Sequence, residues 1–284
     1  MVARARDLRT GADGSPEVLG EDGFEAVVAV DRALRRIDHH DGRLAALVGA
    51  PVAGGFRARA VAAVPDEAER LSLLDLLLDD MPGALLVAGY AMQRHPSWNQ
   101  RRIPVEHLSG AADQCAGWAV EATILRAIDD TGVVPTPTTA PVVAHADDDD
   151  PYAWHDRPVL EPGSMRRARR LDLTELDDGR LAFDVHFRDT YVDREGVEGA
   201  LHEYSVAGHI DADTRTVLDV AADAHVLPWV ECPIALGSAP RIVGAATDDL
   251  RLLVRTDFRG TSTCTHLNDT LRSLADLPAL ATSL

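Results

Sequence analysis

The chain contains no lysine, and all 28 of its basic residues are arginine. A Schiff-base mechanism requires the amine of a lysine, so pyridoxal phosphate enzymes and Schiff-base aldolases are excluded. P-loop proteins and protein kinases also bind phosphate through a lysine, and ordinary nucleotide phosphoryl transfer is therefore not expected.

Other common features are missing as well. No apolar run approaches the roughly 18 residues of a membrane helix, and the N-terminus has no signal-peptide pattern. No Gly-x-Gly-x-x-Gly motif follows a strand-like run, so a Rossmann cofactor site has no support. The cysteines Cys115, Cys232 and Cys264 are odd in number and scattered, which is not a disulfide framework and indicates a reducing cytoplasm.

The charge balance is strongly acidic, with a formal net charge of −18 at pH 7. Nucleic-acid binding needs a basic surface, so this chain is poorly suited to a phosphate backbone. The one basic cluster, residues 166–170, has no interleaved aromatic residues, and we interpret it as an exposed strand start. We therefore expect a small-molecule ligand as partner, with no nucleic acid and no membrane.

Changes in composition divide the chain into four parts. Residues 1–20 are polar and aperiodic and are predicted to form a loose arm. Residues 21–132 are predicted to form an N-terminal α+β half, and residues 133–164, with isolated prolines and a run of four aspartates at 147–150, a linker. The aspartate run lacks the spacing of an EF-hand loop. Residues 165–284 form the C-terminal α+β half.

In the N-terminal half, residues 66–80 are predicted to form a helix, because acidic residues open it and leucines recur along one stripe. Pro82-Gly83 should stop this helix, and residues 85–92 should form a buried strand. A second helix is expected over 111–128. His39-His40 precedes a turn and should be exposed.

In the C-terminal half, four strand-like segments follow one another. Phe183, Val185 and Phe187 alternate with polar residues, which is typical of a strand with one face in water. Turn residues separate the segments, so an antiparallel meander is predicted, with helices over 248–258 and 264–277 after it. The predicted strands are residues 169–176, 181–192, 202–210 and 217–227.

We therefore predict an α+β fold in which a curved antiparallel sheet packs against the C-terminal helices. A hot-dog-like arrangement, with the sheet wrapped around a helix, is a guess within this class. Residues 35–38 and 41–45 also echo residues 169–172 and 178–182. The echo suggests two pseudo-repeated halves, although a chain rich in Arg, Ala, Leu and Asp produces chance matches readily.

The most informative segment lies near the C-terminus, at Cys264-Thr265-His266-Leu267. Competent N-cap residues precede it and leucines follow at helical spacing, so a helix begins here. A cysteine in the first turn lies near the positive end of the helix dipole, which favours the thiolate. Cys264 and His266 are therefore candidates for a nucleophile, a metal-ligand pair or a proton-transfer group.

Several short pieces of the C-terminal half occur in the order of a known family. They are the paired arginines before the first strand, His202-Glu203, Ala222-Asp223-Ala224, Glu231-Cys232-Pro233 and the Cys-Thr-His-Leu segment. On these pieces, residues 166–280 resemble the domain of unknown function numbered 2889. Family members usually have an aspartate where this chain has Glu203 and a glycine where it has Thr263. The resemblance implies no activity.

The candidate site residues come from the ends of separate predicted elements, and three interpretations stay open. In the first they line one pocket, where His266 is a base, Asp223 or Glu203 its acidic partner, and Cys264 a nucleophile or polarising group. In the second, histidines and cysteines bind zinc, although the close ligand pairs of structural zinc sites are absent. In the third they are structural. The candidates are His202, Glu203, Asp223, Cys264 and His266, with Trp229 and Cys232 as pocket walls.

The leading prediction is a cytoplasmic enzyme that needs no cofactor and no metal and acts on a small, partly apolar metabolite. Proton transfer by His266 with a carboxylate suggests a lyase, an isomerase or a hydrolase. The pattern places Cys264 and His266 at the mouth of a concave site, faced by His202 or Asp223. The alternative is a non-catalytic ligand-binding or interaction module in which the same residues are structural.

Overall fold

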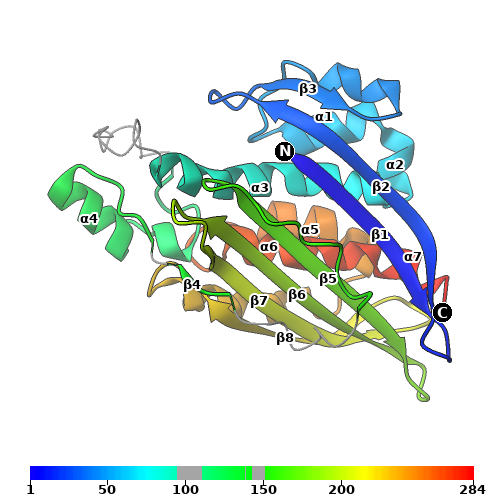
Figure 1. Ribbon diagram of the computed structural model, residues 1–284. Helices are drawn as coiled ribbons and strands as arrows, with labels where there is room; N and C mark the ends of the chain where they lie inside the picture. The colour runs from blue at the N-terminus through cyan, green and yellow to red at the C-terminus, as the bar shows by residue number, and fades with distance from the viewer. Residues whose placement is uncertain (95–110, 138, 143–150) are drawn as a thin grey trace. The chain divides into compact units, whose positions relative to one another are not determined.

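The computed structural model describes residues 1–94, 111–137, 139–142 and 151–284. They form two compact units: Met1–Leu86 with Asp276–Leu284, and Val87–Ala275. Each unit contains its own antiparallel sheet, drawn in blue for the first unit and in green to yellow for the second (Figure 1). The aspartate run at 147–150, which was predicted to belong to a linker, lies outside the described residues.

The sheet of the first unit has the order β1 (Val2–Thr10), β2 (Pro16–Val28) and β3 (Leu34–Asp38). The first 20 residues, predicted as a loose arm, are therefore mostly strand. A turn over residues 11–15 joins β1 to β2, where the Asp13 side chain accepts hydrogen bonds from the N–H and hydroxyl of Ser15. Pairing of β1 with β2 satisfies the backbone hydrogen-bonding groups of this polar segment. Its sequence lacks the apolar alternation that would have predicted a strand.

Helical segments complete the first unit. They are η1 (Gly42–Leu47), α1 (Phe56–Ala63), α2 (Pro65–Glu69), the first part of α3 (Leu73–Arg94) and α7 (Leu277–Ala281). The core lies between the sheet and these helices. Its largest fully buried side chains include Leu34, Leu44, Leu47, Phe56, Leu74, Leu78 and Met81.

Helix α3 overturns two predictions. It runs through Pro82-Gly83 without a stop, and it contains residues 85–92, which were expected to form a strand. Packing explains the difference: Leu78 is buried in the core of the first unit and Val87 in a cluster of the second, which offsets the hydrogen bond that Pro82 cannot donate. The helix predicted over 66–80 is instead broken at Leu71, whose φ is 51°.

The four predicted strands of the C-terminal half are present. They are β5 (Met165–Glu175), β6 (Arg180–Val192), β7 (Glu198–Asp211) and β8 (Val217–Val226), all antiparallel, with β6 and β7 in the centre. The short β4 (Ala140–Pro141) also pairs with β7. At Gly208 a Cβ would lie 2.2 Å from the carbonyl oxygen of Asp219, so the close approach of β7 and β8 requires glycine there.

Helices of the second unit include η3 (Ala116–Trp118), α4 (Thr123–Thr131), η4 (Cys232–Ile242), η5 (Thr247–Asp249), α5 (Leu250–Asp257) and α6 (Thr265–Ser273), continued by η6 (Leu274–Asp276). The helix predicted over 111–128 is thus only η3 and the start of α4. Helices α5 and α6, in orange, lie behind the sheet of their unit (Figure 1). Residues 266–273 of α6 are all buried although most of them are polar.

The α+β class with antiparallel sheets and C-terminal helices is confirmed. The hot-dog-like arrangement and the pseudo-repeat stay predictions; of the matched segments, residues 42–45 lie in a 3-10 helix whereas residues 180–182 lie in β6. Over the described ranges, the structure contains no helix with the length and apolar character needed to cross a membrane.

Candidate functional site

The N-terminus of α6 positions Cys264 and His266. Gly260 has a φ of 79° and opens a turn in which the N–H and hydroxyl of Thr263 donate to its carbonyl at 3.1 and 3.0 Å. Cys264 then caps the helix in an extended conformation, and His266 follows in the first turn. Both side chains are buried, so they do not lie at an open mouth as the sequence suggested.

The central strands bring a carboxylate and a second imidazole to one face of the sheet. Asp189 of β6 is paired in register with His202 of β7 on one side and with Arg167 of β5 on the other. Register partners in antiparallel strands project to the same face, so the three side chains form a row. Asp189 and His202 are only 1% and 2% exposed.

His202 and His266 form a ring stack above this row. Their ring centroids are 3.6 Å apart and their planes differ by 19°. The Nδ1 atom of His202 and the Nε2 atom of His266 lie 3.6 and 3.9 Å from the same Oδ2 atom of Asp189. Both separations exceed a hydrogen bond, and within the described part of the chain neither nitrogen has a hydrogen-bond partner.

Asp189 is held by arginine. Both of its oxygens accept hydrogen bonds from Arg167, at 2.8 Å from Nε and 3.0 Å from Nη2. Arg167 also donates to Asp269 of α6 at 2.8 Å, and Arg272 donates to the other oxygen of Asp269 at 2.5 Å. The positive charges of two guanidinium groups therefore balance the negative charges of two carboxylates. The side chain of Arg167 is only 9% exposed, so the interpretation of residues 166–170 as an exposed cluster is wrong for this residue.

These surroundings set the charge states at neutral pH. Burial alone would raise the pKa of Asp189, but the cation of Arg167 and the hydrogen bonds to the carboxylate hold this pKa well below its usual range. Burial lowers the pKa of His266 well below its ordinary 6.5, and the neighbouring His202 lowers it further. Asp189 is consequently ionised and His266 neutral at pH 7.

Cys264 is a thiol in this environment. The hydroxyl of Tyr204 donates to its Sγ atom at 3.3 Å, and Sγ lies 3.6 Å from Nδ1 of His266. Burial raises the pKa of the Cys264 thiol, which outweighs the helix dipole that the sequence suggested would favour the thiolate. With Nδ1 facing the thiol, His266 directs its Nε2 toward Asp189.

Asp189, His202 and His266 bring three potential metal-ligand atoms within 4.8 Å of one another. A ring nitrogen binds a metal through a lone pair in the ring plane. Because the two rings are stacked at 3.6 Å with planes only 19° apart, one ion cannot lie in both ring planes at a bonding distance. Both oxygens of Asp189 are also engaged by Arg167. The donor set therefore does not fit a divalent ion.

Three of the five predicted catalytic residues, His202, Cys264 and His266, come together at this cluster. Glu203 and Asp223 lie on the opposite face of the sheet, because Glu203 follows His202 along a strand and Asp223 is the register partner of Ser205. Glu203 is buried and accepts hydrogen bonds from Arg188 at 2.5 Å and His186 at 2.9 Å. Asp223 is exposed. The shared pocket predicted for all five residues is therefore not formed.

Sequence reasoning missed several members of the cluster. Asp189 and Tyr204 both lie within strands and belong to no motif. The one available signal was strand alternation, since His202 and Tyr204 are two apart on a predicted strand and must share a face. The register that adds Asp189 and Arg167 is a tertiary feature.

The predicted pocket walls Trp229 and Cys232 lie where η4 packs on η3. A Cβ at Gly117 would lie 2.7 Å from the Sγ atom of Cys232 and 3.2 Å from Cδ1 of Trp229, so this contact requires glycine. Burial, with a smaller contribution from the nearby Cys264, raises the pKa of Cys232 to about 12. Both residues are thus neighbours of the cluster through packing, and their role as pocket walls stays a prediction.

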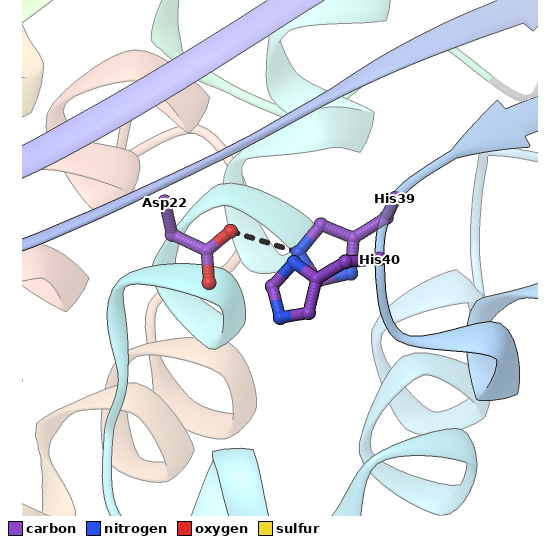
Figure 2. Close-up of side chains that lie close together, drawn as sticks. All are labelled: Asp22, His39 and His40. Carbon is purple, nitrogen blue, oxygen red and sulfur yellow. Dashed lines mark hydrogen bonds and ion pairs between the residues drawn. The ribbon is translucent and has the colours of Figure 1, made fainter.

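A second group of potential ligands occurs in the first unit, where Asp22, His39 and His40 lie close together (Figure 2). Nε2 of His39 lies 2.8 Å from Asp22, and Nδ1 of His39 accepts a hydrogen bond from the backbone N–H of Asp41 at 3.0 Å. Both ring nitrogens are therefore used. The His39 side chain is 1% exposed, which corrects the expectation that it lies at the surface. This group is structural.

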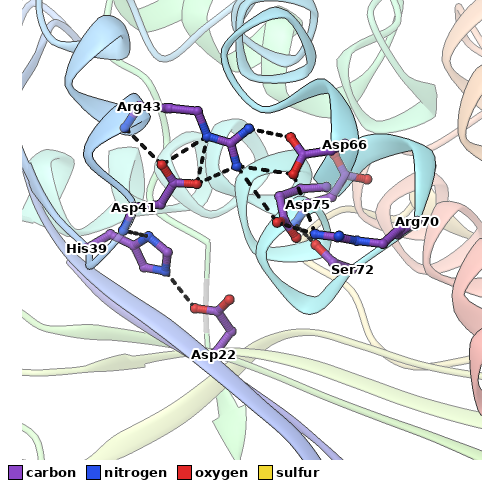
Figure 3. A network of polar contacts seen from close by, with 9 residues as sticks. Asp22, His39, Asp41, Arg43, Asp66, Arg70, Ser72 and Asp75 are labelled. Carbon is purple, nitrogen blue, oxygen red and sulfur yellow. Dashed lines mark hydrogen bonds and ion pairs between the residues drawn. The ribbon is translucent and has the colours of Figure 1, made fainter.

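The same segment joins a wider polar network (Figure 3). Asp41 accepts hydrogen bonds from the backbone and side chain of Arg43, which also contacts Asp66 at the start of α2. Ser72 caps α3 by accepting a hydrogen bond from the N–H of Asp75 at 3.2 Å. These contacts fix loops and helix starts of the first unit. They leave the second unit as the location of the candidate site.

The fold and the buried cluster describe an α+β protein with two stacked imidazoles on an arginine-bound carboxylate, next to a thiol. Comparison with protein families shows that residues 165–279 match the family described as protein of unknown function DUF2889. The match is confined to the C-terminal half, as the sequence resemblance predicted, and it contains β5–β8, Asp189, His202, Cys264 and His266. No curated protein and no solved structure is significantly similar to the chain.

Proposed function

We propose that the protein is a cofactor-independent enzyme that acts on a small, partly apolar metabolite by proton transfer at His266. Asp189 and His202 assist the imidazole, and Cys264 faces its other ring nitrogen. The reaction class is that of a lyase, an isomerase or a hydrolase. A cytoplasmic location is part of the proposal and rests on the three free thiols.

One observation carries this proposal: two buried ring nitrogens, Nδ1 of His202 and Nε2 of His266, lack a hydrogen-bond partner among the described residues. Buried polar atoms are nearly always paired, and exceptions are concentrated where a group must exchange a proton or a ligand. The unpaired nitrogens converge on a single carboxylate oxygen. A purely structural network would gain stability by closing these contacts to hydrogen-bond length.

The roles follow from the charge states. Neutral His266 can accept a proton from a substrate carbon or hydroxyl, since its pKa is held low by burial. The negative charge of Asp189 stabilises the imidazolium that forms. The imidazolium of His266 then gives the proton back to the product, which regenerates the neutral ring, while Cys264 stays a thiol with Tyr204 as donor to its sulfur. No step in this scheme needs a thiolate nucleophile.

Burial supports the alternative, a non-catalytic module. Asp189, His202, Cys264 and His266 are between 1% and 7% exposed, as structural groups would be. Entry of a substrate therefore requires a local opening of the second unit. The two functions differ in a direct way: only the enzyme catalyses exchange of substrate protons with solvent.

That difference gives the test. A panel of small aldehydes, ketones, hydroxy acids and esters is incubated with the protein in D2O, and loss of acidic C–H signals is followed by proton NMR. We expect faster exchange for at least one compound with the native protein and a loss of about 100-fold or more in His266→Asn. His209→Asn is the matched control, since His209 lies on β7 and pairs with Asp219 outside the cluster.

A rate that persists in His266→Asn would remove His266 from the proposed role. If no compound exchanges protons or is hydrolysed faster than in buffer, the non-catalytic module is favoured.

A further inference from the structure

Arg167 of β5 joins the sheet to α6 at the cluster. It donates two hydrogen bonds to Asp189 and one to Asp269, and its guanidinium lies 4.9 Å from the ring centroid of Phe187. A bidentate guanidinium fixes both the position and the orientation of a carboxylate. Arg167 therefore determines where the Oδ2 atom of Asp189 lies.

That atom is shared by two imidazoles. Nδ1 of His202 and Nε2 of His266 are 3.6 and 3.9 Å from it, while the rings are stacked at 3.6 Å. A carboxylate free to rotate would close on one ring and form an ordinary hydrogen bond. Held by Arg167, it stays within reach of both rings and bonds to neither.

We propose that Arg167 is the positioning residue of this site: it holds the Asp189 carboxylate between His202 and His266, so that the two rings take up one proton jointly and act as a single acid–base unit. The inference deepens the proposed function, because a shared proton gives His266 a partner that can receive it. Its physical basis is charge balance.

Charged and titratable groups face the stack from every element packed against it. Arg167 and Asp189 from the sheet form one neutral pair, and Asp269 and Arg272 from α6 form another. Three further titratable groups near the stack, among the described residues, are neutral at ordinary pH, because burial raises the pKa of each of them. They are Tyr204 of β7, Cys264 at the start of α6 and Tyr90 of α3, whose ring lies 6.0 Å from that of His202.

The first proton on the stack is thus attracted by Asp189. A second proton would place two imidazolium rings at 3.6 Å, and the described residues supply no further anion beside them. Two like charges at this distance titrate as a coupled pair with widely separated steps. The stack should hold no more than one proton while the protein is folded.

The test is a pH titration of protein labelled with ¹⁵N-histidine, followed by NMR without substrate. His202→Gln and His266→Gln assign the two rings. In the native protein we expect the signals of both rings to change with one common midpoint, and a second step only when the protein unfolds. In Arg167→Gln the midpoint should rise by about one pH unit, because a cation is lost and the Asp189 carboxylate can close on a ring.

Arg167→Lys keeps the positive charge but cannot donate two parallel hydrogen bonds to one carboxylate. The midpoint should therefore rise less than in Arg167→Gln. The matched control is Arg170→Gln, whose side chain is similarly buried but pairs with Asp172 and Asp184 on the other face. It should leave the midpoint unchanged.

Two separate midpoints in the folded native protein, each with a full proton, would overturn the inference, and so would an unchanged midpoint in both Arg167 variants. The native titration decides the first point even if Arg167→Gln does not fold. Because no substrate is used, the outcome is independent of the exchange assay: a shared proton without catalysis would refute only the proposed function.

Discussion

Asp189 and His202 are register partners on adjacent strands, yet Oδ2 of Asp189 and Nδ1 of His202 stay 3.6 Å apart. A cross-strand carboxylate and imidazole normally close to a hydrogen bond of about 2.8 Å. Here both oxygens of Asp189 are committed to Arg167. The gap is therefore imposed by a third residue, and it leaves the imidazole available for proton transfer.

Replacement of Asp189 by Asn should destabilise the protein by about 3 kcal/mol at pH 7, because Arg167 loses its bidentate partner in a buried position. The pKa of Asp189 is depressed in the folded protein. Its contribution is consequently complete above the unfolded value of 3.8 and is lost only as pH falls below that value. Urea unfolding at pH 7 measures the full effect.

Asp184→Asn is the control, since Asp184 is half exposed and its pair with Arg170 should contribute less than about 1 kcal/mol. An equal decrease in the free energy of unfolding in the two variants would show that the Arg167–Asp189 pair stabilises the protein no more than the Arg170–Asp184 pair does.

Replacement of Glu203 by Gln tests whether this residue is structural. Desolvation opposes ionisation of Glu203, but His186 and Arg188 lower its pKa from 4.5 to about 2. Ionised Glu203 therefore contributes about 3 kcal/mol above pH 4.5, and this contribution is lost as pH falls toward 2. Glu203→Gln should lose about that much at pH 7, with the difference shrinking in acid.

Asp223→Asn, at an exposed position of β8, should change the free energy of unfolding by no more than about 0.5 kcal/mol. A Glu203→Gln variant as stable as the native protein at pH 7 would contradict the structural role.

Much of the C-terminal sheet could be predicted because the alternation of Phe183, Val185 and Phe187 with polar residues has only one simple explanation. The same alternation implies that His202 and Glu203 face opposite sides, so their joint assignment to one pocket conflicted with the predicted strand. Asp189 could not be found in this way. Its partners are 22 residues before it and 13 residues after it, and the register that joins them depends on the whole sheet.

The N-terminal errors have a different origin. Pro82-Gly83 is a strong local stop signal, but Leu78 and Val87 on either side of it are buried, and packing outweighs local propensity. In the first 20 residues the strands are polar and half exposed, so no periodicity marks them. The Asp13-Gly14 turn was the available signal for a hairpin.

The thiols should be unreactive in the native protein. Burial raises the pKa of Cys264, and it raises those of Cys115 and Cys232 to about 12. A disulfide reagent at pH 8 should therefore react with none of them faster than the protein opens, and the rate should rise with urea in parallel with unfolding. Cys264→Ser identifies the contribution of this thiol. Rapid reaction at Cys264 in the absence of urea would mean that it is an accessible thiolate, which the buried cluster does not allow.

Stoichiometric binding of zinc is not expected. One ion cannot lie in the planes of both stacked rings at a bonding distance, and Arg167 occupies both oxygens of Asp189. Dialysis against zinc followed by metal analysis tests this. One zinc per chain that disappears in both His202→Asn and His266→Asn, but not in His209→Asn, would refute the argument from ring geometry.

The central claim is that His266 is a neutral base at physiological pH, held in a buried cluster with His202 and Asp189. The most direct measurement is the ¹⁵N NMR spectrum of the His266 ring at pH 7, assigned with His266→Gln. The structure predicts one protonated and one unprotonated nitrogen, because burial and the neighbouring His202 lower the pKa of His266. A ring protonated on both nitrogens at pH 7 would contradict the account, since an imidazolium cannot accept the proton that the proposed reaction requires.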